Sequence, residues 1–226
     1  MKLQVFEGDP GTWPVFGKAS RESLPRLIRS RRYWWIKRTS DIAFSLLALP
    51  AIGILAIALL LLNPFFNPGP VFYRQARMGR HGTPFLMWKF RTMIPCSMGL
   101  VRAHHEPVEE DRITRLGRFL RKYRLDELPN VFNVLRGEMS VVGPRPDAFE
   151  HAVELIDTVP RYRDRFRVLP GITGIAQVRL GYADTTDIVR RKARYDAFYV
   201  RKARVQTDLH VLARTVGVML TGFGAK

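Results

Sequence analysis

Hydrophobic and polar positions divide the chain unevenly. Residues 42–62 form an uncharged, apolar run of 21 residues, and the stretch 26–38 before it carries six Lys or Arg residues and no acid. As an α-helix the run would extend about 32 Å, close to the roughly 30 Å hydrocarbon core of a bilayer. The pattern predicts a helix that enters a membrane.

Pro50 interrupts this run and should break or kink the helix, because proline lacks a backbone N–H and clashes with the preceding turn. The two halves, 42–49 and 51–62, would be only about 12 Å and about 18 Å long. Basic residues follow the run as well as precede it, which favours the cytoplasmic side for both flanks. A re-entrant hairpin that enters and leaves by the same face satisfies both observations. A full transmembrane span and a buried helix of a soluble protein stay as alternatives.

The rest of the pattern predicts an α/β fold that is mostly helical with one small β-hairpin. The hairpin comprises 71–77 and 84–91, and the helices cover 113–123, 126–136, 148–158, 187–201 and 208–220. The Pro/Gly-rich stretches 143–146 and 170–174 indicate rigid turns. Basic residues interleaved with Tyr195, Phe198 and Tyr199 predict an amphipathic interfacial helix. We divide the chain into an N-terminal basic arm (1–35), a re-entrant membrane helix (36–66) and a cytoplasmic domain (67–226).

Charge and composition narrow the class of partner. The 226 residues carry a net charge of +17, are 46% apolar and include one cysteine. Disorder, a disulfide framework and a cysteine-built zinc site are therefore excluded. The positive charge calls for nucleic acid, acidic lipid or a phosphorylated substrate. The sequence has no P-loop, Rossmann fingerprint, nucleophile elbow or base-reading motif, and His104-His105 has no third ligand at metal-binding spacing.

Two adjacent carboxylates, Asp126 and Glu127, open the predicted helix 126–136. An aspartate at this position is most simply an N-cap. The same position suits phosphate, because free N–H groups favour anions, and Arg121 and Arg124 nearby would keep the aspartate ionised. An ionised carboxylate can attack phosphorus, and a neighbouring carboxylate can help to hold Mg²⁺. The structural and the chemical interpretation both stay open at this point.

Phosphoryl transfer also needs cations around the transferred group. Candidates are Lys89, Arg91, Arg121 and Arg145, the last of which stands between two prolines as a pre-organised fork. Each one alone is more typical of a surface charge, so the signal is their occurrence together with an acidic pair. Asp196 is a weaker candidate and more typical of an ion-pair partner for the surrounding arginines.

Several motifs in a fixed order carry a resemblance to a known family. They are Lys89-Phe90-Arg91-Thr92-Met93, Leu125-Asp126-Glu127-Leu128-Pro129, the stretch from Asn133 to Pro146, and Pro170-Gly171-Ile172-Thr173-Gly174. Over roughly residues 36 to 224 the chain resembles the bacterial sugar transferase family, the monotopic polyprenol-phosphate phosphoglycosyl transferases.

The resemblance implies transfer of a sugar phosphate from a UDP-sugar to undecaprenyl phosphate, with release of UMP, at the cytoplasmic face of the inner membrane. It also implies Mg²⁺ as cofactor, a membrane helix broken at Pro50, and a covalent aspartyl phospho-sugar. By motif, Asp126 is the nucleophile and Glu127 its acidic partner, and both are metal ligands. The candidate substrate-binding residues are Lys89, Arg91, Arg121, Arg145 and Asp196.

The chain departs from the family pattern in a few places. Leu49 precedes Pro50 where many relatives have serine, and Arg124 also stands where serine is common. Arg179-Leu180-Gly181-Tyr182 replaces a frequent Asn-Gly-Arg, which resembles the exopolysaccharide-type branch and leaves the donor sugar unspecified. The extra transmembrane bundle of the large relatives is missing from the sequence, so the resemblance implies a minimal or truncated form.

Two rival hypotheses stay open. In one, the lipid phosphate attacks the donor directly and Asp126 is only a metal ligand. In the other, a membrane-tethered protein binds nucleic acid or anionic lipid without catalysis; release of UMP would contradict it. The partners we expect are the UDP-sugar, undecaprenyl phosphate and membrane lipids, and no nucleic acid, since no base-reading motif is present. The sequence does not settle whether two copies form a homodimer.

Overall fold

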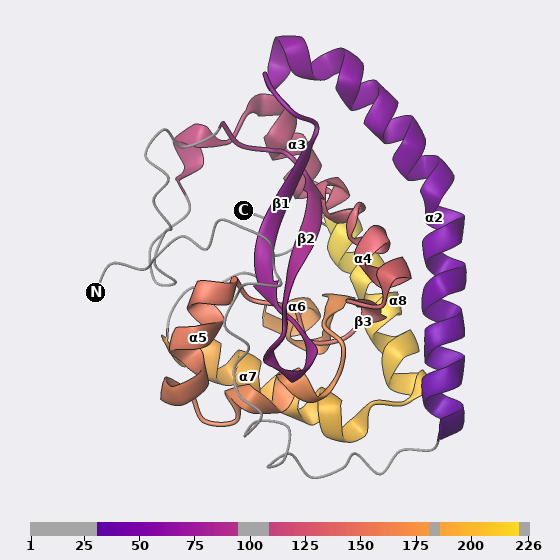
Figure 1. Cartoon of the computed structure of the whole chain (residues 1–226), viewed down its shortest axis with the longest axis vertical. Coiled ribbons are helices and arrows are strands. Elements are labelled where there is room, and N and C mark those ends of the chain that lie inside the picture. Colours follow the sequence, from indigo (N-terminus) through magenta and orange to yellow (C-terminus); the bar gives the residue numbers. More distant parts are fainter. Residues whose placement is uncertain (1–30, 95–108, 181–185, 222–226) are drawn as a thin grey trace.

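The computed structural model of the chain describes residues 31–94, 109–180 and 186–221 (Figure 1). Over these residues it is mostly helical, with two two-stranded sheets. This confirms the prediction of a mostly helical fold with a small β component. Residues 1–30 of the N-terminal arm and His104-His105 lie outside the described residues, whereas 31–35 belong to the first described helix.

Helix α2, Arg31–Phe66, contains the apolar run and is the longest described element. It is continuous through Pro50, so the prediction of two separate half-helices is wrong. Figure 1 shows instead that the helix bends, with its concave side against the rest of the molecule. A proline removes one backbone hydrogen bond, which bends a helix without ending it when the neighbouring turns remain packed.

One side of α2 packs against the body, and the other side is exposed. The buried residues recur every one or two turns along the helix: Tyr33, Asp41, Ser45, Ile52, Leu59 and Asn63. The exposed side carries large apolar side chains, among them Leu47 (81% exposed) and Ile54 (71%). Among the described residues, α2 is the one helix long and apolar enough to cross a membrane. So much exposed apolar surface contradicts the alternative of a helix buried in a soluble core and is consistent with membrane association.

The predicted hairpin is confirmed to within one residue at each strand end. Strand β1, Phe72–Met78, pairs antiparallel with β2, Pro84–Phe90, and the register sets Tyr73 opposite Lys89. Because paired residues point to the same face of a sheet, Tyr73, Gln75 and Arg77 share their face with Lys89. The connecting turn contains two left-handed residues, His81 (φ 60°) and Gly82 (φ 73°).

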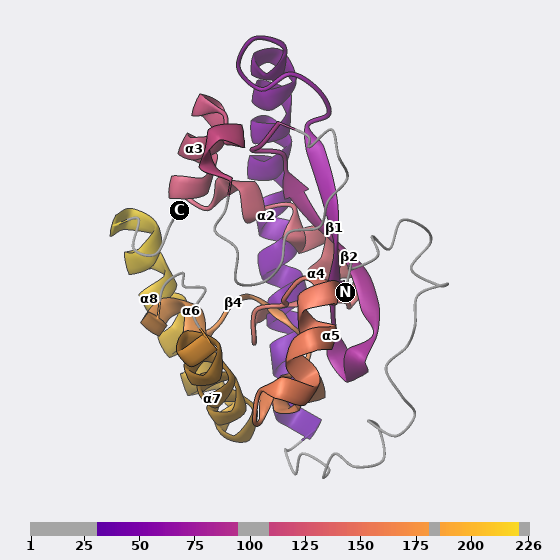
Figure 2. The same cartoon turned by 90° about the vertical axis from the view of Figure 1, so that its left-hand side faces the viewer.

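The six further described helices follow the hairpin along the chain. They are α3 (Arg115–Lys122), α4 (Asn130–Arg136), α5 (Phe149–Thr158), α6 (Ile175–Leu180), α7 (Thr186–Lys202) and α8 (Val205–Thr221). Five of them were predicted, with ends shifted by a few residues. Helix α6 was not, because six residues are too few to show a helical period. Figure 2 shows α7 and α8 on the side of the body away from the hairpin.

Two of the three aromatic residues of α7 pack against the core, although the sequence predicted that they would face a membrane surface. Tyr199 is 2% exposed, and its hydroxyl donates to the carbonyl of Val142 (3.0 Å) and to Asp208 (2.8 Å). Phe198 is exposed, but Tyr195 packs partly against the core. The basic residues of α7 other than Lys192 therefore form the solvent side of a helix whose other side packs on the core. Helix α8 instead exposes apolar side chains, namely Leu209, Val216 and Leu220.

A second small sheet adjoins the predicted rigid turns: its first strand ends just before 143–146, and its second lies within 170–174. Strand β3, Ser140–Val142, pairs in parallel with β4, Gly171–Thr173. Glycines allow this contact: a Cβ atom on Gly171 would lie 2.1 Å from the backbone nitrogen of Gly143. The close approach brings the two motifs 143–146 and 170–174 side by side and places Arg145 at the end of a buried strand.

Candidate active site

The acidic dyad, Asp126 and Glu127, lies on a single 3₁₀ turn, Leu125–Glu127, that precedes α4. The predicted helix 126–136 therefore begins only at Asn130. Pro129 accounts for the difference, because it has no N–H to continue the helix backwards. Neither residue acts as the predicted N-cap, since Pro129 precedes α4 and the turn is preceded by left-handed Arg124 (φ 54°) without a capping hydrogen bond.

Glu127 is held by two cations. The guanidinium of Arg145 donates to both carboxylate oxygens, Nη1 to Oε2 at 2.8 Å and Nη2 to Oε1, and Lys89 Nζ lies 3.4 Å from Oε1. Burial alone would raise the pKa of Glu127, but the charges of Arg145 and Lys89 outweigh burial and hold it well below its usual range. Glu127 therefore stays ionised and immobile at any pH near neutrality.

Asp126 stands beside this pair in a different electrostatic state. It is 8% exposed, and in the part of the chain that the structure describes its carboxylate has no hydrogen-bond partner. Burial, followed by the negative charge of Glu127, raises its pKa from 3.8 to about 6, against the opposing charges of Lys89, Arg145 and Arg121. The sequence predicted that nearby arginines keep Asp126 ionised; Arg121 does lower its pKa, but burial and Glu127 have the larger effect. The group is still mostly ionised at pH 7 but is unpaired.

The cations around the dyad come from four separate segments. Lys89 is on β2, Arg145 follows β3, Arg121 ends α3 and Arg124 precedes the turn. Burial, then the charges of Arg145 and Arg77, lowers the pKa of Lys89 to about 8 although Glu127 opposes the change. Nη1 of Arg121 is buried and has no hydrogen-bond partner. Positive charge therefore exceeds the negative charge of the dyad.

Two of the predicted site residues have other roles. Arg91 Nη2 donates to the backbone carbonyls of Asn67 (3.1 Å) and Pro68, and the guanidinium packs on Gly69. Arg91 thus fastens the chain where α2 ends, rather than contacting the dyad. Asp196 is 1% exposed and forms an ion pair with Arg165, which confirms the weaker interpretation of it as an ion-pair partner.

Sequence reasoning missed Arg77 and Arg165. Arg77 donates to the carbonyl of Pro146 (3.2 Å) and to Gln75 (2.6 Å), and its charge reaches Lys89 and Glu127. The period of two along the predicted hairpin, which sets Arg77 on the same face as Lys89, could have identified it. No sequence signal distinguishes Arg165 from its neighbours Arg163 and Arg167.

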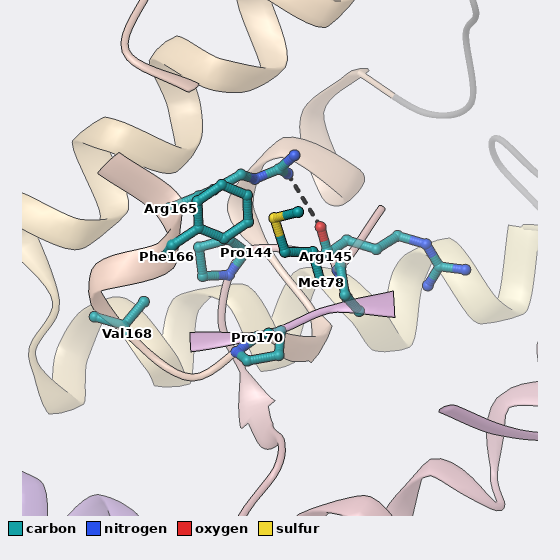
Figure 3. A pocket seen from close by; sticks show the side chains of 9 residues that line it. Met78, Pro144, Arg145, Arg165, Phe166, Val168 and Pro170 are labelled. Atoms are coloured by element: carbon teal, nitrogen blue, oxygen red, sulfur yellow. Dashed lines mark hydrogen bonds between the residues drawn. The ribbon is translucent and has the colours of Figure 1, made fainter. Parts of the chain in front are cut away.

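Two hollows of the described part of the chain lie away from the dyad. One of about 10 Å³, smaller than a sugar, lies behind Arg145 between Met78, Pro144 and Pro170 (Figure 3). Another, of about 360 Å³, is lined by residues 156–163. Asp126 and Glu127 are therefore presented beside the cations rather than at the bottom of either hollow.

Among the described residues, the acidic dyad sets two carboxylates side by side, which suits a divalent cation. Within residues 31–94, 109–180 and 186–221, no three His, Cys, Asp or Glu side chains gather into a metal cage. Mg²⁺ does not need one, because it is usually held by one or two carboxylates together with substrate phosphates. Asp126 has the chemistry of such a donor, because its carboxylate stands next to a second carboxylate and accepts no hydrogen bond from the described residues.

Comparison with known proteins finds relatives that match most of this chain. One relative, from Aeromonas hydrophila, is named UDP-N-acetylgalactosamine-undecaprenyl-phosphate N-acetylgalactosaminephosphotransferase; it is 38% identical over 90% of this chain and 48% of its own length. A UDP-glucose:undecaprenyl-phosphate glucose-1-phosphate transferase from Caulobacter vibrioides is 37% identical over 88% of this chain and 73% of its own length. The exopolysaccharide production protein PSS of Rhizobium leguminosarum is 35% identical over 82% of this chain and 96% of its own length.

The family match covers most of the chain, as the relatives do. The chain spans about half the length of the Aeromonas relative but nearly all of the Rhizobium protein. The family pattern described as bacterial sugar transferase matches residues 32–222, from the first turn of α2 to just beyond α8. It includes the dyad and every cation described above. The chain therefore belongs to the bacterial sugar transferase family.

Proposed function

We propose that this chain transfers a sugar-1-phosphate from a UDP-sugar to undecaprenyl phosphate and releases UMP, the first step in assembling a membrane-linked polysaccharide. The observation that carries the proposal is the acidic dyad itself: an unpaired, buried Asp126 next to a Glu127 locked by Arg145 and Lys89. Relatives matched over 73% and 96% of their own length bear names of this activity and of exopolysaccharide production, respectively.

In the first step, an oxygen of Asp126 attacks the phosphorus that bears the sugar. The bond from that phosphorus to the bridging oxygen breaks, and UMP leaves with the bond's electron pair. In the second step, an oxygen of undecaprenyl phosphate attacks the same phosphorus and displaces Asp126, which regains its carboxylate. The product is a sugar linked through a diphosphate to the lipid, and no proton or electron remains unaccounted for.

The surroundings of Asp126 support the role of nucleophile over that of N-cap. A carboxylate that already accepts hydrogen bonds must give them up before it can attack, and among the described residues none donates a hydrogen bond to Asp126. Lys89, Arg121, Arg124 and Arg145 supply positive charge where the diphosphate gains negative charge. Glu127 orients two of these cations and is itself too strongly paired to attack.

Mg²⁺ is the cofactor that fits these residues. Asp126 and Glu127 would hold it together with phosphate oxygens of the donor, and when bound it would neutralise diphosphate charge. Arg145 would keep Glu127 in place at the same time, because its fork already engages both carboxylate oxygens.

We further propose that α2 is re-entrant and that the body lies on the cytoplasmic face of the inner membrane. Near its start, Lys37 pairs with Asp208 (3.0 Å) and Arg38 donates to the carbonyl of Val134 (2.6 Å). At its end, Asn67 donates to the carbonyl of Arg91 (2.8 Å). A helix fastened to one body at both ends cannot place those ends on opposite sides of a bilayer. The bend and the exposed apolar side support a shallow insertion.

The test is release of UMP from UDP-glucose and undecaprenyl phosphate in nanodiscs with Mg²⁺, followed by a panel of other UDP-hexoses. With radiolabelled donor alone, the wild-type protein should retain label and Asp126→Asn should not. Asp157→Asn is the matched control, because Asp157 is exposed on α5. Turnover without any trapped label would favour direct attack by the lipid phosphate. No UMP with any donor would leave the non-catalytic alternative.

A further inference from the structure

The segment that carries Arg145 is held by its backbone at four consecutive residues. The donors are Gly171 N to Pro144 O (2.9 Å), Arg165 Nη2 to Arg145 O (3.0 Å), Arg77 Nη1 to Pro146 O (3.2 Å) and Met78 N to Asp147 O (3.3 Å). These donors come from different parts of the chain: β4, the 3₁₀ segment Tyr162–Arg167, and β1. The position of the Arg145 backbone is therefore set by tertiary contacts rather than by its own turn.

Arg165 makes the contact at Arg145 itself. Its side chain is 3% exposed; Nη1 donates to Asp147, and Nη2 donates to the carbonyl of Arg145 and to Asp196 (2.5 Å). Figure 3 shows the carbonyl of Arg145 facing Arg165 while its guanidinium extends to the other side, toward Glu127. Arg165 therefore contacts the backbone of Arg145, and the side chain of Arg145 contacts Glu127.

A neutral group of buried charges holds Arg165 in turn. We call Asp147, Tyr162, Arg165, Lys192 and Asp196 the support network. Asp147 accepts from Tyr162 (2.6 Å), Arg165 and Lys192, and its pKa lies well below the usual range because these partners outweigh the effect of burial. Replacing such a buried network by apolar side chains is often neutral for stability, so its presence calls for a role in specifying geometry.

We propose that Arg165 is a positioning residue for the transfer reaction: it holds the Arg145 backbone so that the Arg145 fork remains aligned on Glu127 beside Asp126. The inference rests on the proposed function for its catalytic consequence. In this proposal Asp147, Lys192 and Asp196 hold Arg165 in place and do not bind the substrate. A guanidinium suits this place because two separate nitrogens donate, Nη1 to Asp147 and Nη2 to Asp196 and the Arg145 carbonyl, whereas the ammonium of lysine has one nitrogen.

Arg165→Lys is the decisive variant, because it keeps the charge that Asp147 and Asp196 need but loses the fork. We expect kcat for UMP release to fall by about ten-fold to about 100-fold, in line with the effect of about 1 Å of misalignment at a reacting group. KM for the UDP-sugar should change much less. Arg163→Lys is the matched control in the same 3₁₀ segment, since Arg163 is 55% exposed and pairs only with the exposed Asp157. It should behave as wild type.

A double-mutant cycle separates positioning from general damage. If Arg165 acts through Arg145, adding Arg165→Lys to Arg145→Met should reduce kcat no further. Losses that multiply in the double variant would overturn the proposal, as would full activity of Arg165→Lys. Should Arg165→Lys fail to fold by circular dichroism, Asp196→Asn takes its place in the same cycle. It removes one anchor of Arg165 and should reduce kcat at least about three-fold with the same lack of additivity.

A measurement without substrate keeps this inference distinct from the proposed function. Carboxyl ¹³C NMR of the labelled protein in nanodiscs follows the titration of Asp126, which the charge of Arg145 lowers. In Arg165→Lys a displaced Arg145 should let the Asp126 midpoint move upward, and in Arg163→Lys it should stay. If wild type releases no UMP but this shift occurs, the proposed function fails and the positioning role stands; an unmoved midpoint overturns the positioning role.

Discussion

Two isosteric substitutions in the acidic dyad should have opposite effects on stability: Asp126→Asn should stabilise the protein, and Glu127→Gln should destabilise it. In Asp126 the carboxylate is disfavoured by burial and by Glu127, so that its pKa rises from 3.8 to about 6. That displacement corresponds to about 3 kcal/mol of folding free energy lost on ionisation at pH 7. Asp126→Asn removes the charge and should therefore stabilise the protein, by about 2 kcal/mol because the amide remains a buried polar group.

Glu127→Gln should do the reverse. The charge of Glu127 is favoured in the fold, since Arg145 and Lys89 hold its pKa below the usual range against burial. Removing it leaves both cations without their partner. Breaking a fully buried pair costs about 3–5 kcal/mol, and we expect about 2–3 kcal/mol. The smaller value applies because the Arg145 side chain is 22% exposed. Both variants should lose transfer activity. Only in Asp126→Asn should the loss of activity accompany a gain in stability.

Thermal unfolding in nanodiscs across pH measures both changes. For a chain of this length, 1 kcal/mol moves Tm by about 2–4 °C, so Asp126→Asn should melt about 4–8 °C above wild type at pH 7. A raised folded-state pKa means that wild type loses stability as pH rises from 3.8 through about 6. The gain should therefore vanish near pH 4. For Glu127, whose folded-state pKa is depressed, the penalty should be present above pH 4.5 and shrink below it. The reasoning would be refuted by a lower Tm of Asp126→Asn than of wild type at pH 7, or by a difference in Tm between the two that does not change with pH.

Three further predictions concern the nucleophile, the small sheet and the end of α2. Labelling of the protein by donor should rise with pH through the Asp126 pKa of about 6, with an initial rate about ten-fold lower at pH 5 than at pH 7; a flat profile contradicts it. Gly171→Ala should cost about 1–3 kcal/mol, because its Cβ meets the backbone of Gly143, whereas Gly217→Ala on α8, with open space around it, should be neutral or slightly stabilising in the same melts. Arg91→Met should lower Tm by removing the donor to the buried carbonyl of Asn67 and the partly buried one of Pro68, without changing KM for the UDP-sugar; a raised KM would return Arg91 to the substrate site.

The dyad shows how far local sequence could locate the site. The adjacent Asp126 and Glu127, with Lys89 and Arg145 as cations, are all recognisable as motif residues, and the structure brings these four together. The state of each carboxylate was not predictable. Asp126 and Glu127 are neighbours in sequence, yet one is unpaired with a raised pKa and the other is locked with a lowered one. That difference arises from burial and from side chains 18 and 38 positions away.

Helix α2 shows the same division in the membrane segment. Its apolar run and Pro50 are local properties, and they correctly indicated a helix with a disturbance in the middle. Whether the proline breaks the helix or bends it depends on what the neighbouring turns pack against. Asp41 is an example: its carboxylate accepts from Ser140 Oγ (2.7 Å) and Val141 N (3.1 Å), about 100 residues away.

The amino-acid sequence by itself determined the elements and the chemistry available: an apolar helix, a hairpin, amphipathic helices, and two carboxylates among many cations. These depend on side-chain period and on short motifs, which act over a few residues. Only the tertiary structure decided that Arg91 and Asp196 serve the fold, that Tyr199 is buried, and that Arg165 supports Arg145. Those outcomes depend on which distant groups share a low-dielectric interior, where each buried charge must find its partner.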